Sequence, residues 1–470
     1  MQSFGHIFLV GIKGAGMANI AVIIKKMGGT VSGSDREDVF ITDKLLAEHS
    51  IHWSAGFHLK DLPHNTKLVV YSAAHGGKTN PQVTEAEKRG VKTMHQADFL
   101  NVIMSQCKTK VAVAGCHGKT TTSALLAEAL IRLGAEPGYF IGAPYFGQYK
   151  GGDFQQKNYF VIEADEYGIN PPTDKTPKFL SLNPNIILCT NIDFDHPDVY
   201  DSLEDTKKAY MRFFDSRQLI LCADDTVLRS LVPQLNKNSI TTYGFDAYAD
   251  LLITENKTNE IGSQFRLQYK GSNIGDFAIN LFGKKNILNA AGVILTLIHL
   301  GFKPEDVRKS IADFVGAARR FSLVYKAGSM FLIDDYAHHP NEIKATIEAA
   351  RDRFPTRRIV TVFQPHTYSR TSAFLHEFVE ELSAADMSFV LPIFPSAREN
   401  PKNFPVLSEM IVKTAIEKGK KNIVAVATVN ELTEKLHGYL NKTDVLLTMG
   451  AGNVYELKKD IINVIDIKAT

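Results

Sequence analysis

The sequence predicts an α/β protein in three domains, each built on a sheet of mainly parallel strands. Apolar runs of strand length alternate with helical patterns through residues 7–101, 109–315 and 330–470. Such alternation is typical of βα units around a parallel sheet. A chain of 470 residues is also too long for a single hydrophobic core. We therefore predict a Rossmann-like domain at 1–106, a central α/β domain at 107–317 and a Rossmann-like α/β domain at 318–470.

Composition excludes several classes of function. The net charge of +2 gives no electrostatic reason to expect nucleic acid or an anionic membrane as a partner. The chain shows neither a signal peptide nor a run of about eighteen apolar residues, so we expect no secretion and no membrane insertion. The cysteines are scattered without C-x-x-C spacing, which fits a reducing cytoplasm; they are Cys107, Cys116, Cys189 and Cys222.

A glycine-rich turn follows the first predicted strand. Gly11, Gly14 and Gly16 have the spacing G-x-x-G-x-G, the reverse of the dinucleotide fingerprint. Asp35 ends the second predicted strand, where a carboxylate in such folds holds a ribose hydroxyl. We interpret the turn as a site for pyrophosphate and ribose that need not belong to a nicotinamide. The alternative is that the glycines serve close packing and that Asp35 forms a turn.

The stretch Val111–Ser123 runs from a strand through a glycine turn into a helix. Backbone N–H groups at such a helix start bind phosphates, Lys119 adds a positive charge, and the hydroxyl of Thr120 can bind magnesium. Val113 stands where the standard G-x-x-x-x-G-K-[ST] pattern has its first glycine. The context predicts a phosphate-binding loop, and hence a central domain of the P-loop, ATP-binding type. The alternative is a plain glycine turn.

Polar residues follow two further apolar strands of the central domain. Glu163 ends the strand that begins at Tyr159, and Asn191 and His196 follow the next one. The carboxyl ends of parallel strands share one edge of a sheet, the edge that carries the phosphate loop. We therefore predict that Thr120, Glu163 and His196 share a magnesium–nucleotide site, in which the imidazole would allow manganese substitution. The alternatives are acidic turn residues and a helix cap.

The third domain opens with Arg319 and Arg320, followed by a strand at 330–335. The turn after this strand holds two histidines, and Pro340 with Glu342 indicates a helix start. Histidines in such a turn can simply cap the helix, and the arginines can pair with surface carboxylates. These residues alone leave structural and functional interpretations open.

Taken in order, the motifs resemble those of the Mur ligases, enzymes that use ATP to add amino acids to a UDP-muramoyl peptidoglycan precursor. The resemblance covers essentially the whole chain. It depends on G-I-K-G-A-G-M (11–17), S-G-S-D (32–35), A-G-C-H-G-K-T-T-T (114–122), E-A-D-E (163–166), T-N-I-D-F-D-H (190–196), R-R-F (319–321), D-D-Y-A-H-H-P (334–340) and G-A-G (450–452).

A further block narrows the resemblance within the family. Residues 363–371, F-Q-P-H-T-Y-S-R-T, are similar to a block in the members that add L-alanine to UDP-N-acetylmuramate. Glu166 and Tyr167 instead resemble the members that attach the recycled tripeptide L-Ala-γ-D-Glu-meso-diaminopimelate to the same nucleotide sugar. We expect the L-alanine reaction and keep the tripeptide reaction as the alternative.

The resemblance implies a reaction in two steps. ATP phosphorylates the lactyl carboxylate of UDP-N-acetylmuramate to give an acyl phosphate and ADP. The amino group of L-alanine then attacks the acyl phosphate, an amide forms and phosphate leaves. The resemblance also implies Mg²⁺, a cytoplasmic enzyme, and a monomer or weak homodimer. Because all three domains contribute, we expect the third domain to close over bound ATP.

The resemblance implies a role for each motif residue. Predicted ATP-binding residues are Gly115, His117, Gly118, Lys119, Thr120, Thr121, Asn286, Arg320 and Asp335. The UDP-sugar is predicted to meet Gly11, Gly14, Gly16, Met17, Asp35 and Ser72. The acceptor or the intermediate is predicted to meet Tyr336, His338, His366 and Arg370. The predicted catalytic residues are Lys119, Glu163, His196 and His338, and the predicted metal ligands are Thr120, Glu163 and His196.

Four positions depart from the family pattern. Cys116 replaces a threonine at a helix start, where the pKa of a thiol tends to fall, so we expect a site sensitive to oxidation. Lys13 replaces a glycine in the N-terminal turn, and Lys285 replaces a histidine beside the predicted adenine contact. Thr367 replaces an arginine, which leaves Arg370 with more of the local positive charge.

Two other classes of function explain less of the sequence. A nicotinamide-dependent oxidoreductase would use the N-terminal turn, but its glycine spacing is reversed and the phosphate loop lies elsewhere. A switch or motor ATPase would use the loop at 111–123, but the first glycine is missing and a further βα domain follows.

Overall fold

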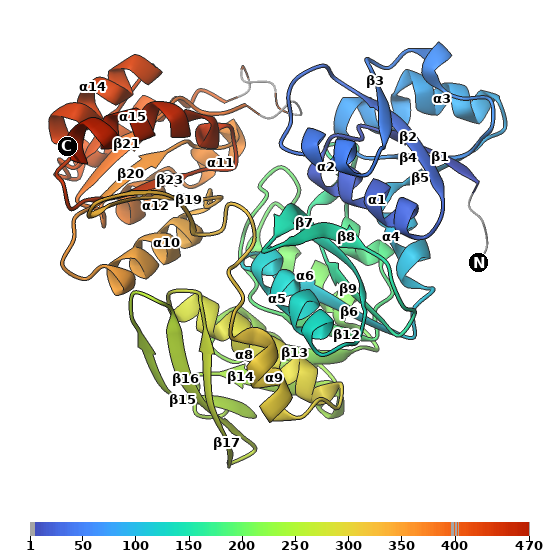
Figure 1. Cartoon of the computed structure of the whole chain (residues 1–470), viewed down its shortest axis with the longest axis horizontal. Helices are drawn as coiled ribbons and strands as arrows, with labels where there is room; N and C mark the ends of the chain where they lie inside the picture. Colours follow the sequence, from blue (N-terminus) through green and yellow to red (C-terminus); the bar gives the residue numbers. More distant parts are fainter. Residues whose placement is uncertain (1–4, 396–398, 400–401, 403, 470) are drawn as a thin grey trace.

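The computed structural model describes residues 5–395, 399, 402 and 404–469 of the chain. They form three α/β domains that follow one another along the sequence (Figure 1). The predicted fold class is confirmed, whereas the boundaries at 106 and 317 stay a prediction. Among the described residues, no helix combines the length and the apolar character needed to span a bilayer.

The N-terminal domain is a five-stranded parallel sheet with the order β3-β2-β1-β4-β5. This is the order of dinucleotide-binding folds, in which ligands bind at the carboxyl ends of the strands. The turn between β1 and α1 therefore lies at the binding edge. The elements are β1 (His6–Val10), α1 (Ala15–Lys26), β2 (Thr30–Asp35), α2 (Asp43–Glu48), β3 (His52–Ala55), β4 (Thr66–Tyr71), α3 (Pro81–Lys88), β5 (Lys92–His95) and α4 (Gln96–Met104).

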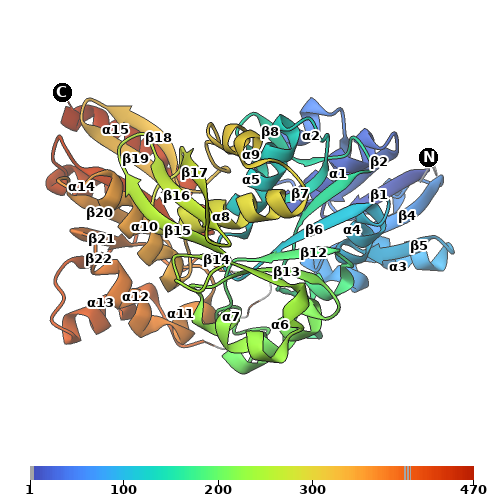
Figure 2. The same cartoon turned by 90° about the horizontal axis from the view of Figure 1, so that it is seen from below.

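The central domain is organised around a ten-stranded sheet with the order β17-β16-β15-β14-β13-β12-β6-β9-β7-β8. Helices α5, α8 and α9 cover one face and α6 and α7 the other (Figure 2). The strands are β6 (Thr109–Ala114), β7 (Gly138–Phe146), β8 (Tyr149–Asp153), β9 (Tyr159–Glu163), β12 (Ile186–Cys189), β13 (Gln218–Cys222), β14 (Ile240–Gly244), β15 (Leu251–Thr258), β16 (Ser263–Tyr269) and β17 (Ser272–Ile279). The helices are α5 (Lys119–Arg132), α6 (Leu203–Phe214), α7 (Thr226–Leu231), α8 (Lys284–His299) and α9 (Pro304–Ile311).

The middle of this sheet is parallel, as predicted, but both ends are not. Strands β15, β16 and β17 pair antiparallel at one end, and β7 and β8 form an antiparallel hairpin at the other. A separate antiparallel hairpin, β10 (Gly168–Asn170) with β11 (Asp174–Pro177), follows β9. Strands β15–β17 bury only part of their residues, so they lack the continuous apolar runs that mark a parallel strand in a sequence.

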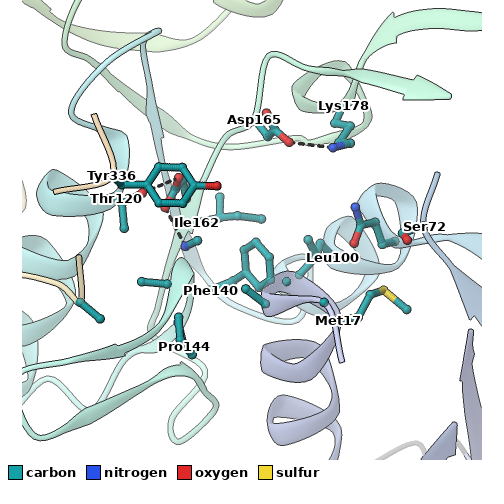
Figure 3. A pocket seen from close by; sticks show the side chains of 18 of the residues that line it. Met17, Ser72, Leu100, Thr120, Phe140, Pro144, Ile162, Asp165, Lys178 and Tyr336 are labelled. Atoms are coloured by element: carbon teal, nitrogen blue, oxygen red, sulfur yellow. Dashed lines mark hydrogen bonds and ion pairs between the residues drawn. The ribbon is translucent and has the colours of Figure 1, made fainter. Parts of the chain in front are cut away.

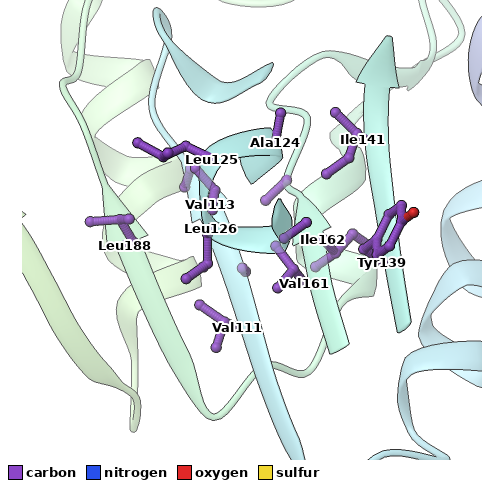
Figure 4. Close-up of a cluster of buried hydrophobic side chains, with 14 of the residues drawn as sticks. Val111, Val113, Ala124, Leu125, Leu126, Tyr139, Ile141, Val161, Ile162 and Leu188 are labelled. Atoms are coloured by element: carbon purple, nitrogen blue, oxygen red, sulfur yellow. The ribbon is translucent and has the colours of Figure 1, made fainter. Parts of the chain in front are cut away.

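The core of the central domain fixes the ends of β6 and β9 (Figure 4). Val113 of β6, Val161 of β9 and Leu188 of β12 are fully buried in one cluster with Leu125 and Leu126 of α5. Burial of each such side chain stabilises the fold by about 1.5–3 kcal/mol. The residues that directly follow these strands are therefore held in fixed positions.

The C-terminal domain is a six-stranded sheet with the order β18-β19-β23-β20-β21-β22, in which only the β18–β19 pair is antiparallel. His339 and Glu342 cap α10 reciprocally, so the predicted helix start at Pro340 is confirmed. The strands are β18 (Ser322–Ala327), β19 (Met330–Asp335), β20 (Ile359–Phe363), β21 (Met387–Val390), β22 (Ile423–Ala425) and β23 (Val445–Met449). The helices are α10 (Pro340–Arg353), α11 (Tyr368–Ala373), α12 (Leu375–Leu382), α13 (Ser408–Glu417), α14 (Val429–Tyr439) and α15 (Lys458–Ala469).

The first two domains are packed more intimately with each other than with the third. Helix α1 packs on β7 and β8, and the two domains share one hydrophobic cluster. The buried Asn19 of α1 donates to the backbone oxygens of Ile141 (2.8 Å) and Ala143 (3.0 Å). The C-terminal domain has its own hydrophobic clusters on the two faces of its sheet. The joint near residue 318 is therefore the place where a domain can move at least cost.

Candidate active site

Two glycines shape the loop between β6 and α5. Gly115 has a φ of +126°, and a Cβ atom there would lie 2.1 Å from Thr190 Oγ1. Gly118 has a φ of +82°, and a Cβ atom there would lie 2.9 Å from Asn289 Oδ1. Neither position can hold a side chain without displacing its neighbour. The predicted arrangement of strand, glycine turn and helix is confirmed.

Lys119 opens α5, and its ammonium group lies beside a carboxylate. Its Nζ is 2.7 Å from Glu166 Oε2 and donates to the backbone oxygen of Cys116 at 3.0 Å. Burial alone would lower the pKa of Lys119, but the adjacent Glu166 carboxylate outweighs burial and raises the pKa. Lys119 is therefore a fixed positive charge at a helix start, a position that favours anions.

Glu163 ends β9 beside the start of α5. Its Oε1 accepts a hydrogen bond from Thr120 Oγ1 (2.9 Å), and its Oε2 accepts one from the Gly142 amide (2.7 Å). Burial raises the pKa of Glu163, and the charge of Lys119 opposes that shift. Arg320 of the third domain donates from Nη2 to Thr120 Oγ1 at 3.2 Å. Two domains therefore meet at Thr120 and Glu163.

His196 follows β12 in a left-handed conformation, with a φ of +58°. Such strain is uncommon in residues other than glycine and concentrates at functional sites. Its Nε2 lies 3.3 Å from Glu166 Oε1 and 3.7 Å from Asp195 Oδ2. Burial would lower the pKa of His196, but the Asp195 and Glu166 carboxylates raise it. The imidazole is therefore held between two acidic side chains.

The structure brings Lys119, Glu163 and His196 together in one cavity of about 290 Å³, which we call the phosphate-loop cavity. A single pocket for these three residues was the central expectation from the sequence. Other predicted residues also line it, namely Gly118, Thr120, Arg320, Tyr336, His338, His366 and Arg370.

Two groups of ligand atoms in the phosphate-loop cavity fit a divalent ion. Thr120 and Glu163 offer hydroxyl and carboxylate oxygens 2.9 Å apart, which suit Mg²⁺ with water in its remaining positions. Glu166, Asp195 and His196 offer atoms that all lie within 4.8 Å of one another, a mixed set that also suits Mn²⁺. Glu166 and Asp195 were not predicted as ligands, although they belong to the motifs E-A-D-E (163–166) and T-N-I-D-F-D-H (190–196).

A second cavity, of about 570 Å³, lies between the N-terminal turn and the central sheet (Figure 3). Gly14, Gly16, Met17 and Ser72, all predicted to bind the UDP-sugar, line it, and we call it the glycine-loop cavity. The two cavities adjoin at a junction, because six residues line both of them: Thr120, Glu163, Asp165, Lys178, Arg320 and Tyr336.

Asp165 and Lys178 at this junction were not predicted as site residues. Lys178 Nζ donates to Asp165 Oδ2 at 2.7 Å (Figure 3). Burial works to raise the pKa of Asp165, but the ammonium groups of Lys178 and Lys119 hold it well below its usual range. Asp165 belongs to the E-A-D-E motif and could have been found there. Lys178 follows an unmarked hairpin and belongs to none of the motifs.

Two predicted residues of the N-terminal turn do not line the glycine-loop cavity. Asp35 is buried; its Oδ2 accepts from the Lys13 amide (2.7 Å), and its Oδ1 lies 3.2 Å from His75 Nε2. Gly11 has a φ of +81°, and a Cβ atom there would lie 3.2 Å from the His75 ring. Burial works to raise the pKa of Asp35, but the hydrogen bonds from His75 and Lys13 lower it. Both residues contact their own domain in this structure, and their predicted contacts to the UDP-sugar stay predictions.

Lys13 is turned into the N-terminal domain rather than toward the glycine-loop cavity. Its side chain is 1% exposed, and Nζ lies 3.2 Å from Asp43 Oδ1. The ammonium group also lies over the Trp53 ring, 4.1 Å from its centroid, and 4.9 Å from the centroid of Phe40. Lys13 therefore ties segment 36–43 to the glycine turn.

A third cavity, of about 350 Å³, adjoins the phosphate loop at His117 and Gly118, and we call it the α8 cavity. Lys285 and Asn289 of α8 line it. The predicted adenine contact, Asn286, does not line it, because its Nδ2 donates back to the oxygen of Phe282 at 2.8 Å. Lys285 and Asn289 therefore border this cavity, and the adenine contact of Asn286 stays a prediction.

His117 joins the phosphate loop to the third domain. Its Nε2 lies 2.9 Å from Asp193 Oδ2, and its Nδ1 lies 3.4 Å from Glu342 Oε1 of α10. The His339 ring packs against the His117 ring, with 4.7 Å between centroids. Burial would lower the pKa of His117, but hydrogen bonds to Asp193 and Glu342 raise it to about 9. The protonated imidazole therefore connects two carboxylates from different domains.

Besides Asn286, three predicted nucleotide-binding residues line none of the three cavities. Asp335 accepts hydrogen bonds from the amides of Phe321 and Ala337, both at 2.9 Å, and burial raises its pKa to about 6. Gly115 and the buried Thr121 shape the loop and the helix start. Gly115 and Thr121 thus contribute to the shape of the loop, and Asp335 fixes the backbone at the start of the third domain.

Two histidines of the third domain line the phosphate-loop cavity beside Tyr336. His338 Nδ1 lies 2.9 Å from the backbone oxygen of Tyr336 and 3.1 Å from Glu342 Oε2. Burial lowers the pKa of His366 well below its usual value, and its ring lies 6.1 Å from that of His338. His366 is therefore neutral at physiological pH.

Arg370 does carry positive charge in the phosphate-loop cavity, but this charge is already paired. Its Nη2 lies 2.7 Å from Asp195 Oδ1. Thr367 has a φ of +68°, and its Oγ1 accepts from the Arg370 amide at 3.3 Å. Thr367 thus caps α11 and fixes the backbone of Arg370.

Cys116 contradicts the expectation of a reactive thiol. The residue is 6% exposed, and its Sγ donates to the backbone oxygen of Asp193 and accepts from the Asp193 amide, both at 3.2 Å. Burial and the nearby Glu166 carboxylate raise the pKa of Cys116 well above its usual value. The prediction of an oxidation-sensitive site is wrong, because burial outweighs the effect of the helix start.

Three family models match the chain in succession. The model described as Mur ligase family, catalytic domain, matches residues 6–108. The Mur ligase middle domain matches residues 113–297. The Mur ligase, glutamate ligase domain, matches residues 319–452.

Curated relatives are similar to the chain over nearly its full length. The UDP-N-acetylmuramate–L-alanine ligase of Chlorobaculum parvum is 34% identical over 460 residues, which cover 96% of this chain and 94% of the relative. The enzyme of the same name from Lactobacillus acidophilus is 36% identical over 451 residues, covering 96% of each.

Solved structures share the fold. A UDP-N-acetylmuramate–alanine ligase from Thermotoga maritima superposes with a TM-score of 0.79 at 23% identity, covering 98% of this chain and 100% of that one. A murein peptide ligase from Psychrobacter arcticus superposes with a TM-score of 0.72 at 22% identity, covering 98% of each. The sequence relatives, the family models and the shared fold lead to one conclusion: the chain belongs to the Mur ligase family.

Proposed function

We propose that this chain is an ATP-dependent ligase that joins L-alanine to the lactyl carboxylate of UDP-N-acetylmuramate. The observation that carries the proposal is the junction of two cavities, one bordered by the phosphate loop and one by the N-terminal glycine turn. A phosphate donor and a nucleotide sugar can meet there. The relatives that are 34% and 36% identical bear the name of this reaction.

In this proposal ATP occupies the phosphate-loop cavity and the α8 cavity. The amides at the start of α5 and the charge of Lys119 hold the phosphates, while Lys285 and Asn289 border the space for the base. The phosphoryl group gathers negative charge as it is transferred, and positive groups fixed in advance stabilise that charge. Lys119 supplies one such group from the central domain, and Arg320 supplies another from the third.

Thr120 and Glu163 would hold the expected Mg²⁺, and Glu166, Asp195 and His196 could hold a second ion. When bound, such ions neutralise charge on the transferring phosphate. The chain's own part is to orient the ligands: Thr120 donates to Glu163, and His196 is kept between its two acidic neighbours.

The nucleotide sugar occupies the glycine-loop cavity. Gly14 and Gly16 let the ligand approach the backbone where α1 begins, and amides at a helix start favour pyrophosphate. Met17 and Ser72 border the same space. From there the lactyl carboxylate reaches the junction, next to Thr120 and the phosphate loop.

L-Alanine approaches from the third domain, past His338, His366 and Tyr336. Because His366 is neutral, a protonated amino group meets no like charge at that ring. Closure of the third domain would exclude water, which would otherwise hydrolyse the acyl phosphate. Through Arg320 and His338 the third domain completes the site once it is closed.

Phosphate release tests the proposal directly. The purified chain is mixed with ATP, Mg²⁺ and UDP-N-acetylmuramate, and a panel of amino acids is tested as acceptor. We expect release to require both the UDP-sugar and L-alanine, with glycine and L-serine poorer. Phosphate release that ignores the UDP-sugar would contradict the proposal.

The same assay separates the alternative, attachment of the tripeptide L-Ala-γ-D-Glu-meso-diaminopimelate. One observation favours that reaction, namely the position of Tyr167. The alanine-adding members usually have a serine here, whereas Tyr167 resembles the tripeptide-adding members. Tyr167 lines the phosphate-loop cavity and donates to Asp198 Oδ2 at 2.5 Å. Turnover with the tripeptide but not with L-alanine would establish the alternative. The family chemistry would be unchanged.

We also propose a cytoplasmic location and a monomer or weak homodimer. All four cysteines lie within the described residues, and all are free and buried, as is usual in a reducing compartment. Sedimentation at several protein concentrations would test the oligomeric state.

A further inference from the structure

Lys178 lies where the two cavities meet, and the proposed reaction does not yet give it a role. It lines both the phosphate-loop cavity and the glycine-loop cavity, and its side chain is 13% exposed (Figure 3). It directly follows β11, and its amide donates to the oxygen of Tyr167 at 3.0 Å. The residue is therefore held at the end of a short hairpin, with its ammonium group at the junction.

The charges at the junction are balanced before any substrate binds. Of the six residues that line both cavities, Glu163 and Asp165 are acidic, and Lys178 and Arg320 are basic. A sugar carboxylate that approaches a triphosphate there brings an anion toward other anions. Such an approach needs a positive partner, since a partly buried charge is costly without one.

Arg320 is engaged on the side of the phosphate loop. Its Nη2 donates to Thr120 Oγ1 at 3.2 Å, and its guanidinium lies 4.9 Å from the centroid of the Tyr336 ring. Lys178, which follows β11, is the other cation among the six residues that line both cavities, and it lies beside Asp165. The two cations can thus serve different anions, the phosphate and the sugar acid.

The ammonium group of Lys178 has capacity for a second carboxylate. It has three N–H donors, and the hydrogen bond recorded for it among the described residues goes to Asp165 Oδ2, at 2.7 Å. Its Nζ also lies over the Tyr167 ring, 5.1 Å from the centroid. Asp165 and Tyr167 orient the group, so a substrate carboxylate could bind without displacing Asp165.

We propose that Lys178 binds the lactyl carboxylate of the UDP-sugar and holds it at the junction for phosphoryl transfer. This inference rests on the proposed function and deepens it, because it assigns recognition of the acid group to one residue. UDP-N-acetylglucosamine has the same nucleotide and a closely similar sugar but no lactyl carboxylate. It follows that Lys178 makes the chain bind UDP-N-acetylmuramate more tightly than UDP-N-acetylglucosamine.

Calorimetric binding of these two UDP-sugars in the absence of ATP tests the inference. The wild-type chain should bind UDP-N-acetylmuramate more tightly. Lys178→Met should weaken that binding about 10- to 100-fold, the usual range for a lost hydrogen bond to a charged group. Binding of UDP-N-acetylglucosamine should change by less than about twofold, because no contact to it is lost.

Two further variants make the test sharper. Lys178→Arg keeps the positive charge and should retain most of the preference for the acid sugar, whereas Lys178→Gln should lose it like the methionine variant. Lys175→Met is the matched control, since Lys175 lies on the same hairpin, is 43% exposed and pairs with Asp201 at 3.3 Å. It should bind both UDP-sugars as the wild type does.

The outcomes separate this inference from the proposed function. Equal weakening of both UDP-sugars in Lys178→Met and Lys178→Gln would overturn the inference, because Lys178 would then support the cavity or the pyrophosphate. An unchanged preference in folded variants would overturn it as well. If the wild-type chain turns over UDP-N-acetylmuramate in either case, the proposed function stands; if it binds neither UDP-sugar, both fail.

Discussion

The N-terminal glycine turn and the phosphate loop are built alike but are used differently. Each follows a buried parallel strand, each opens a helix, and each contains one lysine. Lys119 lines the phosphate-loop cavity, with its Nζ 2.7 Å from Glu166. Lys13 is 1% exposed and lies over the ring of Trp53 inside its own domain. The same local design therefore places a positive charge at a cavity in one case and buries it in the other.

The difference shows that the acidic partner of each lysine, rather than the shape of the turn, sets the direction of its side chain. The acidic partner of Lys119, Glu166, itself lines the phosphate-loop cavity, so the ion pair stays at the surface of that cavity. The partner of Lys13, Asp43, belongs to a segment that folds over the turn. Exchanging each lysine for an uncharged residue should therefore have opposite consequences for catalysis and for substrate binding.

The largest effect is expected from Lys119→Met. Loss of the fixed charge beside the transferring phosphate should lower kcat/KM for phosphate release by about 10²–10³-fold. The fold should be retained, because His196 still lies 3.3 Å from the Glu166 carboxylate. Circular dichroism and UDP-sugar binding serve as controls. A loss smaller than about tenfold would contradict the role of the loop.

Lys13→Met should weaken binding of the UDP-sugar and leave phosphoryl transfer nearly unchanged. Segment 36–43, which includes Ile41 of the glycine-loop cavity, would lose its anchor to the turn. We expect KM for the UDP-sugar to rise about tenfold and kcat to change by less than about twofold, since the lost ion pair and cation–π contact do not touch the phosphate site. Steady-state kinetics measure both constants.

A matched control is Lys44→Met, which removes a lysine of the same domain that is 79% exposed. It should leave both constants unchanged. A fall in kcat for Lys13→Met like that of Lys119→Met would contradict the distinction between the two loops.

The comparison also shows what the sequence could predict. Apolar strands that end in Glu163 and before His196 were enough to place both residues at one sheet edge, because parallel strands expose their carboxyl ends together. Three βα patterns were enough for three domains. These predictions depend on backbone topology, and the structure agrees with them.

The sequence could not predict the direction of individual side chains. Asp35 and Asn286 are each hydrogen-bonded within their own domain and line none of the three cavities, so their contacts to a ligand stay predictions. Cys116 stands at a helix start, yet burial raises its pKa. Lys178 follows a hairpin without a motif. Such features depend on contacts between residues far apart in the sequence, which periodicity does not reveal.

A smaller effect is expected from pH, through His117 of the phosphate loop. His117 is charged up to about pH 9 in the folded chain and up to about pH 6.5 when unfolded. Its pairs with Asp193 and Glu342, packed against His339, therefore stabilise the fold fully below pH 6.5, and this stability is lost as the pH rises through 9. Wild type should lose about 1–3 kcal/mol relative to His117→Gln across this range.

Denaturant unfolding of both proteins at several pH values measures this difference. The glycine turn offers the internal contrast, because Lys13→Met should leave the pH dependence as in the wild type. A constant difference between wild type and His117→Gln from pH 6 to pH 10 would mean that His117 does not bridge the two domains as an imidazolium.

The smallest effect is expected from Cys116→Thr, a change within the phosphate loop itself. A threonine hydroxyl can replace the thiol in both contacts, donating to the Asp193 oxygen and accepting from its amide. Activity should stay within about twofold of the wild type, because both contacts of the side chain to the Asp193 backbone are kept. In the native protein a maleimide should react with Cys116 at least about tenfold more slowly than in denaturant, since the thiol is buried and protonated. Rapid native labelling of Cys116 with loss of activity would contradict the burial of the thiol and would show that the phosphate loop opens.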